Sequence, residues 1–289
     1  MSETTHNLPR SLDELRQEID RLDSAIHTAL MERMAVVEEL AGAKGDAASM
    51  RPAREMEVLR ALVTAHEGAL PIAHVIGLWR EIMANSLMWQ TPYSVAFFSG
   101  GQDLSFWDLA RFHFGSATPL APQGTIGHVL QEVSQTDGSI GILPEPMFEE
   151  AEAWWPHLLF TGDDGPRVIA KLPLFEGAAG YDFPGALALG KVIQRPTGED
   201  ASLMVVLADV NLRRAKVIDA CSAAGIEAKL LAVAPDPSNA GQRFLLFETT
   251  DFVSEDDARL VILNEECDGI LRARIIGGYA KPIQLGEGN

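Results

Sequence analysis

Residues 11–44 decide the fold of the first part of this chain, and they read SLDELRQEIDRLDSAIHTALMERMAVVEELAGAK. Apolar residues recur every three or four positions, which is the spacing of one buried stripe on an α-helix. They are Leu12, Leu15, Ile19, Leu22, Ile26, Leu30, Met34, Val37 and Leu40. Ser11 and Glu14 form an S-x-x-E capping box, which predicts the start of the helix. At ~1.5 Å per residue the helix is roughly 50 Å long, so its stripe needs a long partner or a second copy of itself.

Cationic side chains on this helix predict an anion site that two chains share. Arg33 and Lys44 are eleven residues apart, so at ~100° per residue they lie on nearly the same face, about 16 Å apart along the axis. They are placed to hold a small anion from both ends. Arg16 precedes Arg33 by seventeen residues, about 26 Å along the axis, so it serves an equivalent pocket only in another chain. We therefore expect a homodimer in which Arg16 acts across chains.

Composition limits the classes of partner. The 289-residue chain is 47% hydrophobic and has a formal net charge of −18, whereas nucleic-acid binding requires a basic surface. We therefore expect neither nucleic acid nor an anionic membrane as a partner. Two cysteines are too few for a disulfide scaffold. The start MSETTHNLPR has no apolar core, and no apolar run approaches the ~20 residues of a membrane span, so we expect a cytoplasmic protein.

The remaining pattern predicts an all-α part followed by α/β parts. Pro52 opens a second helix that Gly68 stops, and Pro71 opens a third that runs to about Gln90. Thr91-Pro92 is typical of a domain boundary. We predict a disordered lead over residues 1–10, a three-helix dimer domain over 11–92, an α/β domain over 93–198 and a last domain over 199–289.

Short apolar runs between Gly and Pro residues predict the elements of the α/β parts. In the third domain we expect strands over residues 95–98, 139–143 and 168–172, with helices over 104–114, 126–133 and 148–155. The Gly-rich stretch 175–184 has no assignment. From residue 203 the order is βαββαβ, which is the ferredoxin-like pattern. Its strands are expected over 203–208, 226–233, 243–248 and 270–276, and its helices over 212–224 and 255–266.

Seven polar residues on the three predicted helices form the candidate site. They are Arg16, Arg33, Lys44, Arg54, Glu55, Ser86 and Gln90. Ser86 and Gln90 are four residues apart and share a helix face. Each of the seven alone is more typical of a solvated helix face or a surface ion pair. The three helices bring the seven together, and the set as a whole favours a binding site.

At these residues the chain resembles the all-helical class of chorismate mutase. The resemblance runs from about Leu12 to Gln90 and keeps the order and spacing of every polar position. The segments that carry it are LRQEIDRLDSAI with Arg16, LMERM with Arg33, AGAKG with Lys44, RPAREMEVL with Arg54 and Glu55, and NSLMWQ with Ser86 and Gln90. It implies an intertwined helical dimer, in agreement with the distance between Arg16 and Arg33.

The resemblance implies that chorismate, a dicarboxylate, rearranges to prephenate in one pericyclic step without a cofactor or a metal. Holding the substrate in its compact chair is an orientation effect. Fixed donors stabilise the negative charge that grows on the breaking ether oxygen. By resemblance, Lys44 and Gln90 donate to that oxygen. Arg33 and the Arg16 of a second copy clamp the carboxylates, a contact that suits guanidinium geometry.

The resemblance also assigns roles to the remaining site residues. Ser86 adds a carboxylate contact, and Glu55 accepts a hydrogen bond from the ring hydroxyl. Arg54 helps to position Glu55 or the substrate. Some relatives carry an acid in the loop before the second helix that assists the hydroxyl contact. The nearby position here is Arg51, and Asp46 is the alternative acid.

Beyond residue 92 the chain resembles the prephenate dehydratase and ACT regions of bifunctional phenylalanine-pathway proteins. VAFFSGGQDLSFWDLARFHFG, GSIGILPEP and IIGGYAKP carry this resemblance. The Thr-Arg-Phe motif of dehydratase chemistry has no counterpart, and the nearest candidates are Gly165-Pro166-Arg167 and Phe183-Pro184-Gly185. The interval for a second lobe is too short, and ADVNLRRAK and VAPDPS stand where ACT ligand loops would be. We interpret this part as a degenerate region that kept its fold and lost its catalytic residues.

The leading hypothesis is a chorismate mutase of aromatic amino acid biosynthesis, toward phenylalanine or tyrosine, with a structural or regulatory C-terminal region. One alternative is a bifunctional mutase and dehydratase with a divergent second active site. Another is a non-catalytic dimer that senses an aromatic amino acid. The seven retained polar residues weigh against the sensor, because a scaffold has no need of two arginines and a lysine that converge.

Overall fold

The computed structural model describes residues 10–44, 50–100, 104–149 and 153–286, without the side chains of Lys44 and Glu266. All but one residue of the predicted lead over 1–10 therefore lies outside the described residues. Contacts divide the chain into two compact units, Met1–Ala47 and Ala48–Asn289, and each has its own organisation. The predicted domain bounds at residues 92 and 198 stay predictions.

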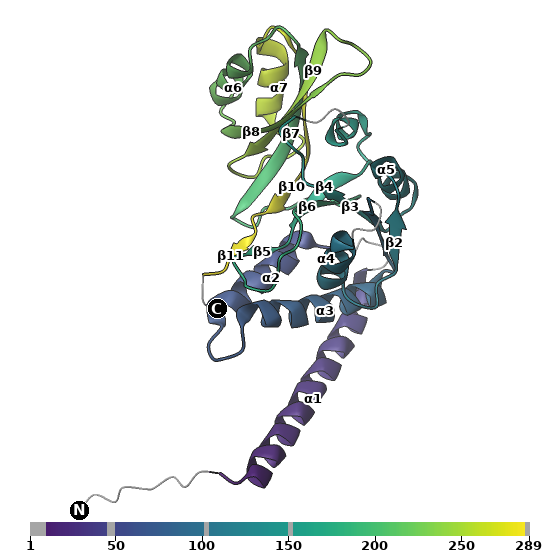
Figure 1. Cartoon of the computed structure of the whole chain (residues 1–289), viewed down its shortest axis with the longest axis vertical. Coiled ribbons are helices and arrows are strands. Elements are labelled where there is room, and N and C mark those ends of the chain that lie inside the picture. The colour runs from purple at the N-terminus through teal and green to yellow at the C-terminus, as the bar shows by residue number, and fades with distance from the viewer. Residues whose placement is uncertain (1–9, 45–49, 101–103, 150–152, 287–289) are drawn as a thin grey trace, which may run out of the picture. The chain divides into compact units, whose positions relative to one another are not determined.

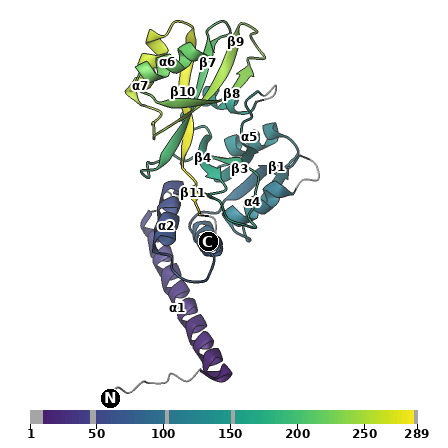
Figure 2. The same cartoon turned by 60° about the vertical axis from the view of Figure 1, so that its left-hand side comes forward.

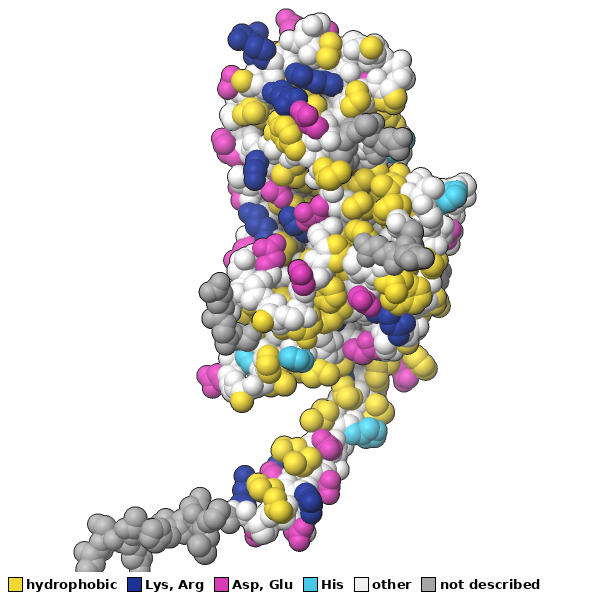
Figure 3. All heavy atoms as spheres, in the orientation of Figure 1, with side chains coloured by type: hydrophobic (Ala, Val, Ile, Leu, Met, Phe, Trp, Pro, Cys, Tyr) yellow, Lys and Arg dark blue, Asp and Glu magenta, His cyan; other side chains and the backbone are white. Residues whose placement is uncertain are grey.

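The described part of the first unit is the predicted long helix, α1 (Leu12–Lys44; Figure 1). Its capping box forms as predicted, because the Glu14 N–H donates to Ser11 Oγ at 3.2 Å and the Ser11 N–H donates to Glu14 Oε2 at 2.7 Å. Much of the predicted stripe is open to solvent along α1, where Leu12 is 71%, Ile26 59% and Leu40 44% exposed. Figure 3 shows apolar side chains along this helix. A single helix cannot bury its own stripe, so α1 needs cover from outside its unit.

The second unit begins with two helices, α2 (Pro52–Ala65) and α3 (Ile72–Gln90). Pro52 occupies the first turn of α2, as predicted. The apolar faces of both helices lie in one core with the strands that follow. This core contains Met56, Leu59, Ile72, Ile76, Met83 and Leu87 from the helices, and Val95, Phe97, Ile140 and Ile142 from the sheet. Helices α2 and α3 therefore fold against the α/β part of the chain.

Three parallel strands carry the first α/β layer. They are β1 (Ser94–Phe98), β2 (Leu120–Gln123) and β3 (Ser139–Pro144), in the order β2-β1-β3. Helices α4 (Ser105–Phe114) and α5 (Ile126–Gln135) connect them. Val95 and Phe97 pack in the core that contains α4, and Ala96 packs in the core that contains α5. Because side chains alternate along a strand, α4 and α5 cover opposite faces, as Figure 2 shows.

The sheet continues through two antiparallel pairings after β3. Strand β6 (Ala186–Gly190) pairs with β3 on one side and with β4 (Arg167–Leu172) on the other. The short strands β5 (Phe175–Glu176) and β11 (Ile283–Gln284) form a separate pair. The predicted α-helix over 148–155 is wrong, because residues 148, 149, 153 and 154 are not helical and Trp155 begins a 3-10 helix. This short helix is η1 (Trp155–Phe160), and Pro156 lies in its first turn.

The C-terminal part is ferredoxin-like, as predicted. Its strands are β7 (Asp200–Asp209), β8 (Ala228–Pro235), β9 (Gln242–Thr249) and β10 (Ile270–Ala280). Its helices are α6 (Arg214–Ala223) and α7 (Ala258–Glu266), and the strand order is β10-β7-β9-β8. Met204 and Val206 of β7 pack in the core of α6 and α7, whereas Leu203 and Val205 pack in the core that contains η1. Both faces of this sheet are therefore covered.

One strand pair joins the two sheets into a single nine-stranded sheet. Strand β10 lies beside β4, with Gly277 in register with Val168. Gly277 has φ = +121°, and a Cβ at this position would run into the backbone of Val168. Glycine alone both adopts a positive φ without strain and has no Cβ, so Gly277 permits the close approach of the two strands. In the described part of the chain, no helix is long and apolar enough to cross a bilayer.

Candidate active site

Three of the seven predicted site residues belong to α1. The Arg16 Nη1 atom lies 3.3 Å from Asp13 Oδ1, and both side chains are more than 70% exposed, so this pair contributes little to stability. Arg33 follows seventeen residues later, about 26 Å along the axis. One small dianion cannot contact both guanidinium groups of one chain. Lys44 is the last residue of α1, and its side chain lies outside the described residues.

Ser86 and Gln90 lie together on one face of α3, as their spacing predicts. Ser86 is 4% exposed, and its hydroxyl donates to the Ile82 carbonyl at 2.7 Å. The Gln90 Nε2 atom donates to the Ser86 carbonyl at 2.9 Å. Each side chain therefore bonds to the backbone carbonyl four residues earlier on α3, which holds the Ser86 hydroxyl and the Gln90 amide one turn apart on the same face.

Arg54 and Glu55 are neighbours in the first turn of α2, but their side chains have different partners. The Arg54 Nη1 atom lies 2.9 Å from Glu57 Oε2 in an exposed pair. The Glu55 Oε2 atom lies 2.5 Å from Arg80 Nη1, and the Glu55 side chain is 20% exposed. The group that holds Glu55 in the second unit is therefore Arg80, and the role of Arg54 stays a prediction.

Sequence analysis missed Arg80, although its position carries a signal. Arg80 lies on the buried stripe of α3, four residues after Ile76 and three before Met83. A charged residue at such a position is either paired or functional. Its Nε atom donates to the His113 carbonyl at 2.7 Å, so the guanidinium joins α3 to α4 as well as to α2. Burial, together with the nearby Arg80 charge, lowers the pKa of His113 well below its ordinary value, so this imidazole is neutral.

The residues nearest to a dehydratase motif are engaged in the structure of the second unit. Arg167 of β4 pairs with Glu255, which also lies 3.2 Å from the Arg274 Nη2 atom. The ring centroids of Phe183 and Phe112 are 5.1 Å apart. Glu145, in the GSIGILPEP segment, lies 3.3 Å from Lys171. These side chains make structural contacts between elements of the α/β part.

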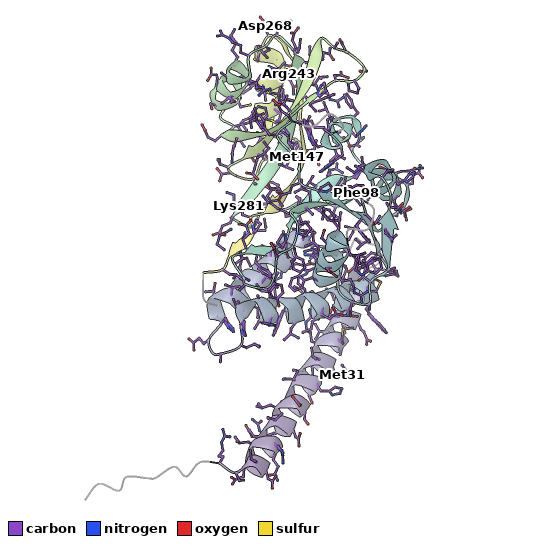
Figure 4. The ribbon with its side chains drawn as sticks, viewed as in Figure 1. Met31, Phe98, Met147, Arg243, Asp268 and Lys281 are labelled. Atoms are coloured by element: carbon purple, nitrogen blue, oxygen red, sulfur yellow. The ribbon has the colours of Figure 1, made fainter. Side chains whose placement is uncertain are left out.

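A cavity of about 700 Å³ lies between the α/β layer and the ferredoxin-like part. It is lined by aromatic residues that include Phe98, labelled in Figure 4, Trp154 and Phe244. The first turn of α5 borders it, where Thr125 Oγ1 accepts a hydrogen bond from the His128 N–H at 3.2 Å. Among the described residues, no group of three or more His, Cys, Asp or Glu side chains could hold a metal ion.

Comparison with known families identifies the helical part. Residues 15–91 match the model of the chorismate mutase type II family, and this range contains all seven predicted site residues. This segment is a chorismate mutase type II domain, which is an isomerase domain. It is followed by the α/β region with the mixed sheet described above.

Curated relatives have two activities in one chain. The bifunctional chorismate mutase/prephenate dehydratase of Neisseria gonorrhoeae is 30% identical over 151 residues, which cover 46% of this chain and 41% of that protein. The protein of the same name from Pseudomonas aeruginosa is 32% identical over 141 residues, which cover 46% of this chain and 38% of that protein. The aligned part thus spans about two fifths of the length of these relatives.

Solved structures provide a looser likeness. The prephenate dehydratase of Streptococcus mutans has a TM-score of 0.46 and 18% identity, covering 67% of this chain and all of that one. A protein described as a quorum quenching acylase, GqqA, has a TM-score of 0.47 and 11% identity, covering 64% of this chain and 94% of that one. Scores below 0.5 are too low to assign a function.

Proposed function

We propose that this protein rearranges chorismate to prephenate in aromatic amino acid biosynthesis. The observation that carries the proposal is the family match over residues 15–91, a range that holds every polar residue expected of the site. The reaction breaks an ether C–O bond and forms a C–C bond within one molecule. It therefore needs no nucleophile, and the protein contributes orientation and fixed charges.

The cations hold the substrate in its compact form. Arg33 and the Arg16 of a second copy each contact a carboxylate of chorismate through paired N–H donors. With both carboxylates fixed, the two carbon atoms that form the new bond are held near each other. The entropy of folding the substrate is then lost on binding rather than in the transition state.

Donors act where charge develops. Lys44 and Gln90 donate to the ether oxygen, which becomes more negative as its bond to carbon breaks. Ser86 contacts a carboxylate, and Glu55 accepts a hydrogen bond from the ring hydroxyl. The hydrogen bond from Gln90 Nε2 to the Ser86 carbonyl supports this assignment, because it keeps the amide beside the serine.

The functional assembly is a homodimer. The distance of about 26 Å between Arg16 and Arg33 along α1 supports this, because one chain cannot bring both to one substrate. The exposed stripe at Leu12, Ile19 and Ile26 supports it as well, since a second α1 would cover these side chains. Each site then contains Arg16 from one chain and Lys44 from the other.

The C-terminal region has a structural or regulatory role and no dehydratase activity. The engagement of Arg167 with Glu255, and of Phe183 with Phe112, supports this view, because these are the nearest counterparts of the missing motif. The bifunctional names of the relatives favour the second candidate, a mutase that is also a dehydratase. Formation of phenylpyruvate from prephenate at neutral pH would decide for that candidate.

The test of the mutase activity is the rate of chorismate consumption by the full chain and by Lys44→Ala. We expect the variant to lose roughly 100- to 1000-fold in kcat, the effect of removing one preorganised donor. Arg21→Ala is the control, because it removes a cation of the same helix that pairs with Glu18 at 2.8 Å. The proposal fails if the full chain consumes no chorismate, and the role of Lys44 fails if its loss leaves turnover unchanged.

A further inference from the structure

Arg80 has the least exposed ion-paired side chain among the described residues, and it touches a residue of the proposed site. Its side chain is 3% exposed. Its two bonds run in different directions, from Nη1 to Glu55 Oε2 at 2.5 Å and from Nε to the His113 carbonyl at 2.7 Å. One guanidinium on α3 thus links the first turn of α2 to the last turn of α4.

The surroundings of Arg80 leave its partners little freedom. Arg80 lines a small cavity with Leu87 and Phe114 of the apolar core, so a change of rotamer would place the charge among apolar groups. His113 is neutral, because burial and the Arg80 charge lower its pKa well below the ordinary value, so it adds no competing cation. A planar guanidinium with donors in a rigid fork fits two acceptors at a fixed angle, which a lysine cannot do.

We propose that Arg80 is a positioning residue of the mutase site, which fixes the Glu55 carboxylate for the substrate hydroxyl by tying it to the backbone of α4. The inference rests on the proposed function and on the role of Glu55 within it. It makes the α/β region part of the catalytic geometry, because one of the two bonds that orient Arg80 ends on α4. In this view the region beyond residue 92 completes the mutase site.

Arg60 provides a matched comparison. It lies on α2, the helix of Glu55, and it also joins that helix to the region beyond residue 92. Its Nη1 atom donates to Thr197 Oγ1 at 2.8 Å, and its Nη2 atom donates to the carbonyls of Glu199 and Lys281 at 2.9 and 3.0 Å. Lys281 is labelled in Figure 4. Arg60 has the same kind of structural role as Arg80, but among the described side chains its hydrogen-bond and ion-pair partners, Thr197, Glu199 and Lys281, lie outside the proposed site.

The test is a double-mutant cycle in the full chain, with kcat and KM for chorismate as readouts. The variants are Arg80→Lys, Glu55→Gln and the two combined, with Arg60→Lys as the control. We expect Arg80→Lys to lower kcat/KM by roughly 10- to 100-fold, the effect of misplacing a catalytic contact. In the Glu55→Gln background the same change should lower kcat/KM by less than about threefold, because the carboxylate that Arg80 positions is no longer present. Arg60→Lys should change kcat/KM by less than about threefold, although it should lower Tm by about as much as Arg80→Lys does.

Two results would overturn the inference. One is an equal loss of kcat/KM from Arg80→Lys in the wild-type and Glu55→Gln backgrounds, which would mark a general structural role. The other is an equal loss from Arg60→Lys, which would show that any loosened contact with the α/β region has this effect. If the wild-type chain consumes no chorismate, the proposed function fails first, and that result differs from an additive cycle in an active enzyme.

A variant that removes both charges keeps the inference testable if Arg80→Lys does not fold. Glu55→Gln/Arg80→Met leaves no buried charge without a partner, and neutral replacement of a buried pair commonly preserves folding. We expect its kcat/KM to lie within about threefold of that of Glu55→Gln alone. A further loss of tenfold or more, with an unchanged circular dichroism spectrum, would contradict a role that acts only through Glu55.

Discussion

The carboxylate of Glu81 receives two hydrogen bonds from Ser116, one from Oγ at 2.6 Å and one from the backbone N–H at 2.8 Å. Glu81 follows Arg80 on α3, and Ser116 follows α4, so this contact joins the two helices beside the Arg80 link. Partial burial favours the neutral acid, but the Ser116 donors, with Asn85, outweigh it and lower the pKa of Glu81 below its ordinary value.

We expect this contact to stabilise the fold above about pH 4.5, the ordinary range of a glutamate, and to be lost as the pH falls through the lower pKa of folded Glu81. The folded state has the lower pKa, so protonation of Glu81 favours the unfolded chain. Urea unfolding of the wild type and of Ser116→Ala between pH 7 and pH 3 measures this. The difference in unfolding free energy should shrink below about pH 4. A constant difference across the range would contradict the prediction, and Ser134→Ala on α5 serves as the control.

Mixing two inactive variants should restore activity if each site contains residues of two chains. Arg16→Ala and Lys44→Ala should each be nearly inactive alone. After unfolding and refolding together in equal amounts, half of the dimers are mixed, and each mixed dimer has one intact site. We expect about a quarter of the wild-type kcat per chain, which follows from random pairing in a twofold dimer. Recovery of no activity in the mixture, although the dimers form, would show that the Arg16 and Lys44 of each site come from the same chain.

Gly277→Ala should destabilise the protein by several kcal/mol, about 3 or more, because the new Cβ meets the Val168 backbone and φ stays positive. Gly127→Ala on α5 is the control, since the nearest atom to its Cβ is Thr125 Oγ1 at 3.9 Å. The control should be neutral or stabilising by up to about 1 kcal/mol. Chemical denaturation measures both. A Gly277→Ala variant as stable as the wild type would show that β4 and β10 separate without cost.

Cys221 should resist thiol reagents in the folded protein. Burial raises its pKa to about 11, and its exposed fraction is 1%. The thiolate is the reactive form, so little of it is present at pH 8. We expect at most one thiol per chain to react with a disulfide reagent at pH 8, and two after unfolding in urea. Cys221→Ser should leave the native reaction unchanged, and rapid labelling of two native thiols would refute the prediction.

Local features of the sequence predicted the helices α1 to α7 and the ferredoxin-like order, but the helix predicted over 148–155 was wrong. The contacts between Ser11 and Glu14 join residues that are three apart in the sequence, so the start of α1 could be predicted without tertiary information. The βαββαβ order followed from the alternation of apolar runs and turns. Strand β6 was missed, because its sequence ALALG has no turn signal or period of its own, and its five residues are buried between β3 and β4. Its pairing with β3 depends on residues more than forty positions away, at Gly141 for example.

The candidate site was predictable as far as residue types and spacing decide it. Ser86 and Gln90 share a helix face, as expected from their separation. The partner of Glu55 was not predictable, because Arg80 is 25 residues away and reaches it only when α2 and α3 fold against α4. Sequence placed Arg54 beside Glu55, whereas its side chain pairs with Glu57 one turn along α2. Tertiary packing decides such pairings, and spacing along one helix does not.

The pairing of β4 with β10 has a mechanical consequence. Hydrogen-bonded neighbours run from β2 to β8 without a gap, so the ferredoxin-like part is an extension of one slab rather than an appended module on a tether. The helix that carries the His113 carbonyl, α4, packs on the same continuous sheet through β1. A signal from the C-terminal strands to α2 and α3 would therefore have a continuous hydrogen-bonded path through the sheet and would cross no tether.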